Sequence, residues 1–348
     1  MRTTKTTHHK HKPNALNHFI MNTIAQNRDF LFLYEAKHTN PNGDPDNENK
    51  PRMDAATQTN LVSDVRLKRY IRDYLKQRDE QIFVDMQGNS KVGMDTRLKS
   101  ILIDKFNDED AAKNLLKDDY TEFQKHLSDQ KGSVDDLLKA MTKKNGKLID
   151  FNQRVLTRLV QQDFIDIRMF GSAFAIEGFN RAITGPIQLA WGYSLNKVHL
   201  LESNTISSIM NDGNSTFGRD HRVKYSLIAF QGTINAAAAR HTGLTEEDVA
   251  RFREAIWAGV SANPTRSKIN QYPLLYVEFT YRENEPNGSL GDLRRYLEVE
   301  PTVEDKAVSD LDDLKLDFTR LYRQREDDSV ESVYERAAGR LDYQKASV

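Results

Sequence analysis

The sequence predicts an α+β fold in which four strands and two helices alternate as βαββαβ, with a charged insertion and a long polar arm between them. Three observations lead to this expectation. Short apolar runs of strand length recur along the chain, and two segments carry apolar residues at helical spacing. A charged stretch with few apolar residues separates the first helix from the second strand.

The composition favours a globular protein. Its 348 residues are 38% hydrophobic, which is enough to fill a core, and the absence of cysteine excludes disulfides, thiolate metal sites and cysteine nucleophiles. The longest apolar runs are strand-sized and the N-terminus lacks the apolar core of a signal peptide, so we expect a cytoplasmic protein that does not enter a membrane. Fifty basic and 51 acidic residues nearly cancel, yet Asn204–Arg240 contains only Asp212 and Asp220 as acids. A neutral total is therefore compatible with a basic groove.

The first segments are a tail, a strand and a turn. Residues 1–27 are polar and basic, and we expect a flexible tail, although His8, His9 and His11 could alternatively bind a metal. Phe30 to Ala36 reads as a strand. The stretch His38–Arg52 is rich in Asn, Gly, Asp and Pro, which is typical of turns.

The first helix is predicted over Leu61–Lys76, where one face is apolar and another is basic. The apolar face holds Leu67, Tyr70, Ile71 and Tyr74, and the basic stripe holds Arg66, Arg69, Arg72 and Lys76. The stripe is either a track for a phosphate backbone or an ordinary solvated face.

The middle of the chain begins with a charged insertion. Residues 78–160 read as helical and loosely patterned. We expect one strand over Phe164–Ile176 and a half-buried strand at Ile187–Leu195, where apolar residues alternate with small or polar ones.

The last third supplies the remaining elements. A polar arm occupies residues 199–224, followed by a strand at Tyr225–Gly232, a helix capped by Thr245 with Asp248 in its first turn, and a strand ending at Tyr281. The charged extension 286–348 is expected to end in an amphipathic helix near Val330–Tyr343. Residues 28–77, 161–198 and 225–285 thus give the βαββαβ succession of a ferredoxin-like or RNA-recognition-type domain, a fold that alone does not establish function.

Several blocks resemble one protein family, the Cas7 backbone subunits of type I CRISPR Cascade complexes in the RAMP superfamily. The blocks occur in the same order as in that family and run from Asp29 to Glu283. They are NPNGDPDNENKPRMD (Asn40–Asp54), LVSDVRLKRYIRDYL (Leu61–Leu75), DIRMFGSAFAI (Asp166–Ile176), TGPIQLAWGYSL (Thr184–Leu195), FGRDHRVKYSLIAFQGTIN (Phe217–Asn235), TGLTEEDVARFREAIWAGV (Thr242–Val260) and TRSKI (Thr265–Ile269). The run IFVDMQGNSKVGMDTRLKSI is similar to the type I-B branch.

The resemblance implies a hand-like, non-catalytic subunit: a modified RNA-recognition palm, helical fingers from 78–160 and a thumb β-hairpin from 199–224. Several copies would stack along a CRISPR guide RNA (crRNA) and present it for pairing with target DNA. The other implied partners are the 5′-handle cap subunit, the large subunit, the small subunits and a recruited helicase-nuclease.

The candidate RNA-binding residues are basic or turn-forming, because a subunit that accepts any guide sequence must contact phosphates and sugars. They are Lys37, Asn40, Asn42, Gly43, Arg52, Arg66, Arg69, Arg168, Arg181, Arg219, His221, Arg222 and Lys224. Gly43 would permit a positive φ angle that brings backbone amides to a phosphate. Ile209, Met210 or Phe217 would be the thumb residue that separates bases.

Two other functions are compatible with the sequence. One is a metal-dependent or histidine-based endoribonuclease that uses Asp44, Asp46, Glu48 and Asp54 or His221, although the carboxylates form no complete ligand set. The other is a general single-strand RNA-binding protein that does not stack. No P-loop or G-x-G-x-x-G turn is present, and the sequence predicts neither a cofactor nor a metal site.

Overall fold

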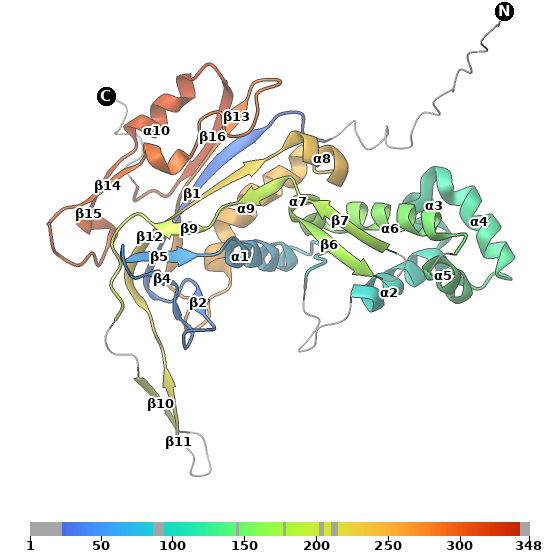
Figure 1. Ribbon diagram of the computed structural model, residues 1–348, viewed down its shortest axis with the longest axis horizontal. Helices are drawn as coiled ribbons and strands as arrows, with labels where there is room; N and C mark the ends of the chain where they lie inside the picture. Colours follow the sequence, from blue (N-terminus) through green and yellow to red (C-terminus); the bar gives the residue numbers. More distant parts are fainter. Residues whose placement is uncertain are drawn as a thin grey trace, which may run out of the picture. The chain divides into compact units, whose positions relative to one another are not determined.

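A computed structural model of the chain describes residues 23–85, 94–143, 146–176, 179–201, 205–209 and 215–341 (Figure 1). The chain divides into two units. One consists of the residues Met1–Thr23, Met86–Gln162 and Ala173–Arg181, and the other of Ile24–Asp85, Asp163–Ser172 and Ala182–Val348. Most of the predicted tail 1–27 lies outside the described residues, and so do His8, His9 and His11. Within the described ranges no helix is long and apolar enough to cross a membrane.

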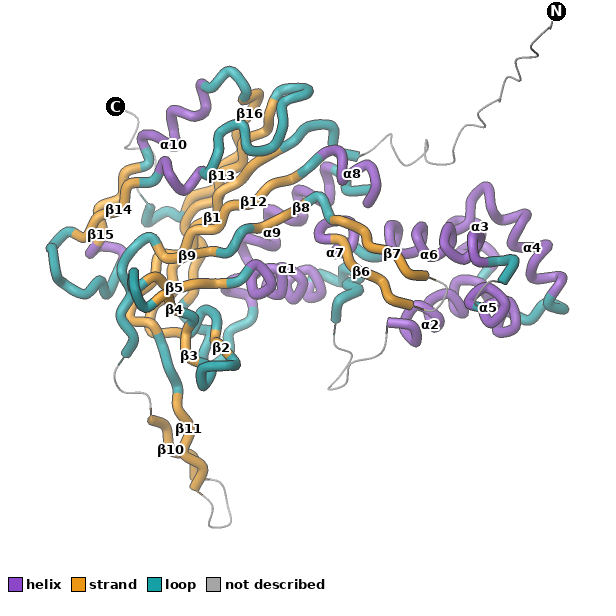
Figure 2. Tube along the Cα trace, viewed as in Figure 1, coloured by secondary structure: helices purple, strands orange, loops and turns teal. Residues whose placement is uncertain are grey.

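The larger unit is built on an antiparallel sheet (Figure 2). Its long strands are β1 (Arg28–Thr39), β12 (Val223–Ile234) and β13 (Gln271–Tyr281), and its strand order is β16-β13-β1-β12-β9-β5-β4, with β8 also paired to β12. The other strands of this sheet are β4 (Met53–Asp54), β5 (Thr59–Val62), β8 (Ile187–Leu189), β9 (Gly192–Ser194) and β16 (Val330–Ala337). Counted along the chain, the first of the four main strands is β1, the second is β8 with β9, the third is β12 and the fourth is β13. Across the sheet they lie in the order β13-β1-β12-β8/β9, which is fourth, first, third, second.

Helices cover one face of this sheet. Helix α1 (Asp64–Gln77) buries Leu67, Tyr70 and Ile71, and α9 (Glu246–Ala262) packs beside it in one apolar cluster with Phe30 and Phe32 of β1. The predicted apolar face of the first helix is confirmed. So is the cap of α9: Thr245 accepts from the Asp248 amide while the Asp248 carboxylate accepts from the Thr245 amide, which forms a capping box.

The other face of the sheet is covered by the C-terminal extension. Leu31 and Leu33 of β1 point to this side, since successive strand residues alternate between faces, and they pack with Leu293, Leu314 and Leu321 of the extension. Burial on both faces explains why FLFLY is apolar without interruption. The extension and turns contain β14 (Glu298–Pro301), β15 (Leu314–Asp317), α10 (Thr319–Arg323), η4 (Leu293–Tyr296), η5 (Leu311–Asp313) and η6 (Gln324–Glu326).

The remaining elements are helices of the smaller unit and short hairpins. The helices are α2 (Met94–Asn107), α3 (Glu109–Leu116), η3 (Lys117–Asp119), α4 (Tyr120–Asp129), α5 (Val134–Thr142) and α6 (Ile149–Asp163). They have a core of their own, in which the rings of Phe106 and Phe123 lie 4.6 Å apart. The hairpins pair β2 (Gly43–Asp44) with β3 (Lys50–Pro51), β6 (Gly171–Ile176) with β7 (Phe179–Thr184), and β10 (Thr205–Ile209) with β11 (Ser215–Arg219). Two further helices are α7 (Ile165–Phe170) and α8 (Ala236–Thr242).

Three predictions about secondary structure were wrong. Residues 165–170 form the short helix α7 before β6, where a continuous strand was expected. The expected strand Ile187–Leu195 breaks into β8 and β9, so the buried face switches to Gly192 and Ser194 while Trp191 is 48% exposed. The expected terminal helix is the edge strand β16, which pairs with β13 because that strand would otherwise leave its backbone groups unpaired.

Candidate nucleic-acid interface

The candidate interface gathers where β1 ends. The chain continues from Thr39 into the turn 40–52, and this turn meets three other segments: the start of α1, residues 219–222 before β12, and the turn Thr265–Asn270 after α9. Asn42 Oδ1 accepts from the Ser63 amide at 2.9 Å, Arg219 Nη1 donates to Glu48 at 3.0 Å, and the Asn40 amide donates to the Ser267 carbonyl at 2.9 Å. Four segments far apart in sequence therefore form one surface.

Two asparagines and a glycine hold the turn 40–52 in its conformation. Asn40 is 3% exposed and its Nδ2 donates to the Asn49 carbonyl at 2.8 Å, while Asn42 joins the turn to the start of α1. The expectation that Gly43 adopts a positive φ angle was wrong, because Glu48 and Asn49 carry the positive φ values instead. Gly43 is needed for space: a Cβ there would lie 1.9 Å from Asn49 Oδ1.

The basic stripe of α1 is not uniform. Arg69 pairs with Asp73 at 2.7 Å, Arg72 pairs with the fully buried Asp166 at 3.0 Å, and Lys76 pairs with Asp85. Arg66 differs, since no carboxylate in the described part of the chain pairs with it. Its guanidinium lies 4.2 Å over the ring of Tyr70 and its Nε is buried without a hydrogen-bond partner.

The segment before β12 contributes further basic groups. Arg222 pairs with Asp220 at 2.7 Å and also donates to the carbonyls of His38 and Arg266 at 3.1 Å, so it holds two turns together. His221 is 7% exposed, and its Nε2 lies 3.9 Å from Glu48. The hydrogen bond from Arg219 and the charge of Lys50 lower the pKa of Glu48.

Other candidates lie near this surface or are engaged elsewhere. Arg52 pairs with Asp44 at 3.3 Å and lies 5.9 Å from the ring of the exposed Trp191. Lys37 pairs with Asp310 of the C-terminal extension and holds the pKa of that carboxyl below its usual range. The Lys224 amide donates to the His199 carbonyl at 2.7 Å, and its side chain is half-buried.

Arg168 lies away from the surface at the end of β1. It forms a two-pronged pair with Asp248, Nε and Nη2 each donating at 2.8 Å, at the N-terminal end of α9. The 17 residues of α9 span roughly 25 Å, and the turn Thr265–Asn270 follows its other end. Its contacts are those of a structural residue.

The remaining predicted residues lie on hairpins. Arg181 is part of β7, Ile209 lies in β10 and Phe217 in β11, where Phe217 is opposite Ser207. Met210 lies outside the described residues.

Lys268 is a member of this surface that the sequence reasoning missed. It is half-buried, its Nζ donates to the Asn40 carbonyl, and it has no carboxylate partner among the described residues. Burial and the nearby charge of Arg66 lower the pKa of Lys268 to about 7. The only sequence signal was its place in the TRSKI block.

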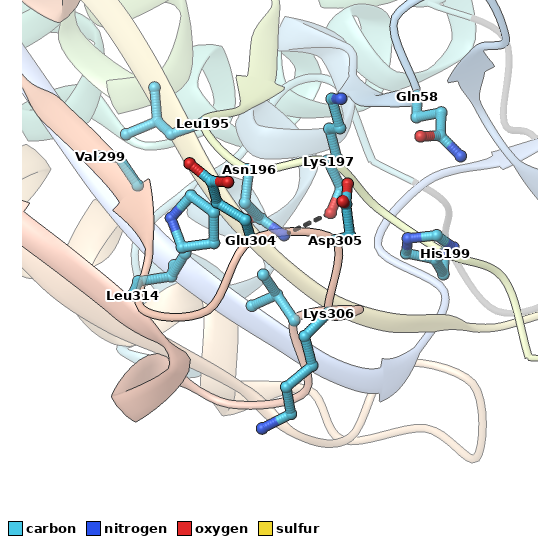
Figure 3. A pocket seen from close by; sticks show the side chains of 12 residues that line it. Gln58, Leu195, Asn196, Lys197, His199, Val299, Glu304, Asp305, Lys306 and Leu314 are labelled. Atoms are coloured by element: carbon cyan, nitrogen blue, oxygen red, sulfur yellow. Dashed lines mark hydrogen bonds between the residues drawn. The ribbon is translucent and has the colours of Figure 1, made fainter.

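A separate cavity of about 530 Å³ lies between residues 195–199 and the C-terminal extension (Figure 3). Its lining combines apolar Leu195 and Val299 with charged Lys197, Glu304 and Asp305, and it contains none of the predicted RNA-binding residues. The described residues contain no group of three or more histidine or carboxylate side chains placed to hold a metal ion.

Comparison with known sequences identifies the family. A sequence model described as CRISPR-associated protein Cas7 matches residues 26–319. The chain belongs to the Cas7 family. A relative from Haloferax volcanii, named CRISPR-associated protein Cas7, is 29% identical over 350 residues that cover 92% of this chain and 89% of the relative. The Cas7 match spans every candidate RNA-binding residue named above, and Lys268.

Solved structures give weaker similarity. A chain of a "CRISPR RNA-guided surveillance complex, pre-nicking" aligns with a TM-score of 0.48 at 16% identity, covering 76% of this chain and 81% of the other. A chain of a second "CRISPR RNA-guided surveillance complex" aligns with a TM-score of 0.39 at 12% identity, covering 76% and 73%.

Proposed function

We propose that this Cas7-family protein is the backbone subunit of a type I CRISPR Cascade complex. Several copies bind along one crRNA through sequence-independent phosphate contacts and present it to target DNA. The observation that carries the proposal is the surface at the end of β1, where Arg66 and Lys268 lie together without a carboxylate partner in the described chain. Unpaired cations on a surface built by four segments suit a phosphate backbone.

The architecture supports a hand-like subunit. Residues 28–77, 161–198 and 225–285 would form the palm, because the strand order fourth-first-third-second with two helices on one face is that of a ferredoxin-like βαββαβ domain. The helices within 78–160 would be the finger, and the hairpin within 199–224 would be the thumb, with Ile209, Met210 or Phe217 as its base-separating residue.

The palm would bind RNA differently from a standard RNA-recognition domain, which stacks bases on its open sheet face. Here that face is buried under the extension 286–341, including Leu293, Leu314 and Leu321. The crRNA would therefore follow the strand ends at residues 40–52, 219–222 and 265–270.

The partners follow from this role. They are crRNA, target DNA, other copies of the same chain, the 5′-handle cap, large and small subunits, and a recruited helicase-nuclease. We assign the subunit no catalysis of its own and no membrane contact.

The endoribonuclease alternative is not favoured by the contacts of its candidate residues. Asp44 pairs with Arg52, and Glu48 pairs with Arg219 and Lys50. Asp54 accepts from Thr57 at 2.8 Å, a hydrogen bond that lowers its pKa. These carboxylates bind different partners and do not converge on one point.

Purification with bound nucleic acid tests the proposal. We expect a particle that contains one RNA of defined length and several copies of the chain, measured by light scattering and RNA sequencing. A monomer free of RNA that cleaves added RNA in the presence of Mg²⁺ would instead establish the nuclease.

A further inference from the structure

The turn that carries Lys268 is held firmly against the end of β1. The Ser267 carbonyl accepts from the Asn40 amide at 2.9 Å and from Thr39 Oγ1 at 2.7 Å, and the Lys37 amide donates to the Asn270 carbonyl at 3.0 Å. Gln271 Nε2 donates to the Lys268 carbonyl at 2.8 Å. These hydrogen bonds hold the backbone of Lys268 against the end of β1.

Lys268 and Arg66 are an unusual pair. The Lys268 ammonium donates to the Asn40 carbonyl, and the Arg66 guanidinium lies over the ring of Tyr70 with its Nε buried and unsatisfied. The two residues meet around Tyr70: Arg66 lies over its ring, and Gln271 Nε2 donates both to the Tyr70 hydroxyl at 3.0 Å and to the Lys268 carbonyl at 2.8 Å. The charge of Arg66 adds to burial in lowering the pKa of Lys268. No described carboxylate pairs with either group.

Such an arrangement is costly without an anion. Burial disfavours a charged lysine, and a like charge beside it adds to the cost. A phosphodiester would relieve both effects, because it carries one negative charge and two non-bridging oxygens that can accept from the ammonium and the guanidinium together.

We propose that Arg66 and Lys268 form one phosphate-binding pair and that RNA binding places a proton on Lys268. This inference rests on the proposed RNA-binding function and adds to it a residue and a linkage to pH. In the free protein near neutral pH the ammonium is partly deprotonated, and the bound phosphate favours the charged form. RNA affinity must then fall as the pH rises above about 7.

Two acids on the surrounding segments already have arginine partners. Asp220 pairs with Arg222 at 2.7 Å and lies 3.7 Å from Arg266, while Glu48 pairs with Arg219. Two imidazoles also belong to these segments, on His38 and His221, so a pH dependence must be traced to Lys268 with variants.

The experiment measures binding of a short, labelled, mixed-sequence single-stranded RNA to the RNA-free full chain, from below pH 7 to about pH 9 at constant salt. We expect the affinity to fall by up to about tenfold per pH unit above pH 7, the limit for one linked proton. Calorimetry in two buffers of different ionisation enthalpy should detect proton uptake on binding.

Variants of Lys268 test whether this residue takes up the proton on RNA binding. Lys268→Met should weaken binding roughly 10- to 100-fold below pH 7, the loss of one charge-assisted hydrogen bond, and should remove the proton uptake. Lys268→Arg keeps a permanent charge, so it should bind RNA and lose the pH dependence. Lys315→Met, on the exposed surface of β15, is the matched control and should behave as wild type. Thermal melts establish that each variant is folded.

The outcomes separate the two claims. If the wild-type chain binds RNA and folded Lys268→Met binds equally well with the same proton uptake, the phosphate pair is wrong and the proposed function stands. If the wild-type chain binds no RNA, the proposed function fails and this inference fails with it.

Discussion

The two ends of β1 treat basic side chains that are at least half-buried in opposite ways. At its start, Arg28 and Arg253 share the fully buried carboxylate of Glu278, at 3.2 and 2.5 Å. At its end, Arg66 and Lys268 lie together with no described carboxylate. A protein that neutralises such charges at one end of a strand and leaves them unpaired at the other indicates which end receives an anionic ligand. Whether a carboxylate pairs with it, more than the number of basic residues nearby, therefore distinguishes a structural arginine from one that binds an anionic ligand.

The largest expected effect is on the free energy of unfolding, from removing the carboxylate that pairs with Arg28 and Arg253 at the start of β1. Glu278→Ala leaves the buried Arg28 and the half-buried Arg253 without their shared partner, which should lower the free energy of unfolding by about 3–5 kcal/mol. Chemical denaturation measures it. Glu298→Ala is the control, because its pair with Arg320 at 3.4 Å is exposed on both sides and should contribute about 1 kcal/mol or less. Equal losses in the two variants would remove the energetic basis of the comparison.

The next effect distinguishes two arginines one turn apart on α1. Arg66→Glu should weaken RNA binding roughly 10- to 100-fold for every guide sequence, since it removes a charge-assisted phosphate contact. Arg69→Glu is the matched control and should change affinity little, because Arg69 is already paired with Asp73. Filter binding with several unrelated RNAs tests this. Equal losses in both variants would restore the whole stripe as the binding track, and a loss confined to one sequence would contradict a phosphate contact.

The last effect, small over any single pH unit, is on the free energy of unfolding in the absence of RNA. The folded pKa of Lys268, about 7, lies below the ordinary lysine value of 10.5, so the unfolded chain binds the extra proton between these values. The free energy of unfolding should therefore rise with pH in that window, by at most about 1.4 kcal/mol per pH unit. Below about pH 7 the contribution is constant. Lys268→Met should lack this slope in denaturation curves; an identical slope would show that Lys268 keeps its proton.

Local patterns predicted several elements because their determinants are close in sequence. The apolar face of α1 repeats every three to four residues, and the capping box of α9 needs only Thr245 and Asp248. Residues 165–170 were misassigned because a helix of six residues is too short to show a period. Residues 330–337 have helical spacing at Val330, Val333 and Tyr334, yet pairing with β13 determines their structure.

The site was harder to predict than the fold because pairing is a long-range property. Arg72 meets Asp166 across 94 residues of sequence, and Arg168 meets Asp248 across 80. No local pattern reveals these partners, so the sequence could not separate Arg66 from Arg72. Lys268 was missed for the same reason, since it reaches Asn40 only through the fold.

The salt dependence of RNA binding tests the central claim most directly. The slope of log affinity against log salt concentration changes by roughly 0.7 for each phosphate contact on single-stranded RNA. We predict that Arg66→Met and Lys268→Met, measured below pH 7, each make the slope shallower by about this amount. Arg69→Met and Lys315→Met should leave it unchanged. Identical slopes in wild type and all four variants would contradict the placement of the crRNA backbone at the end of β1.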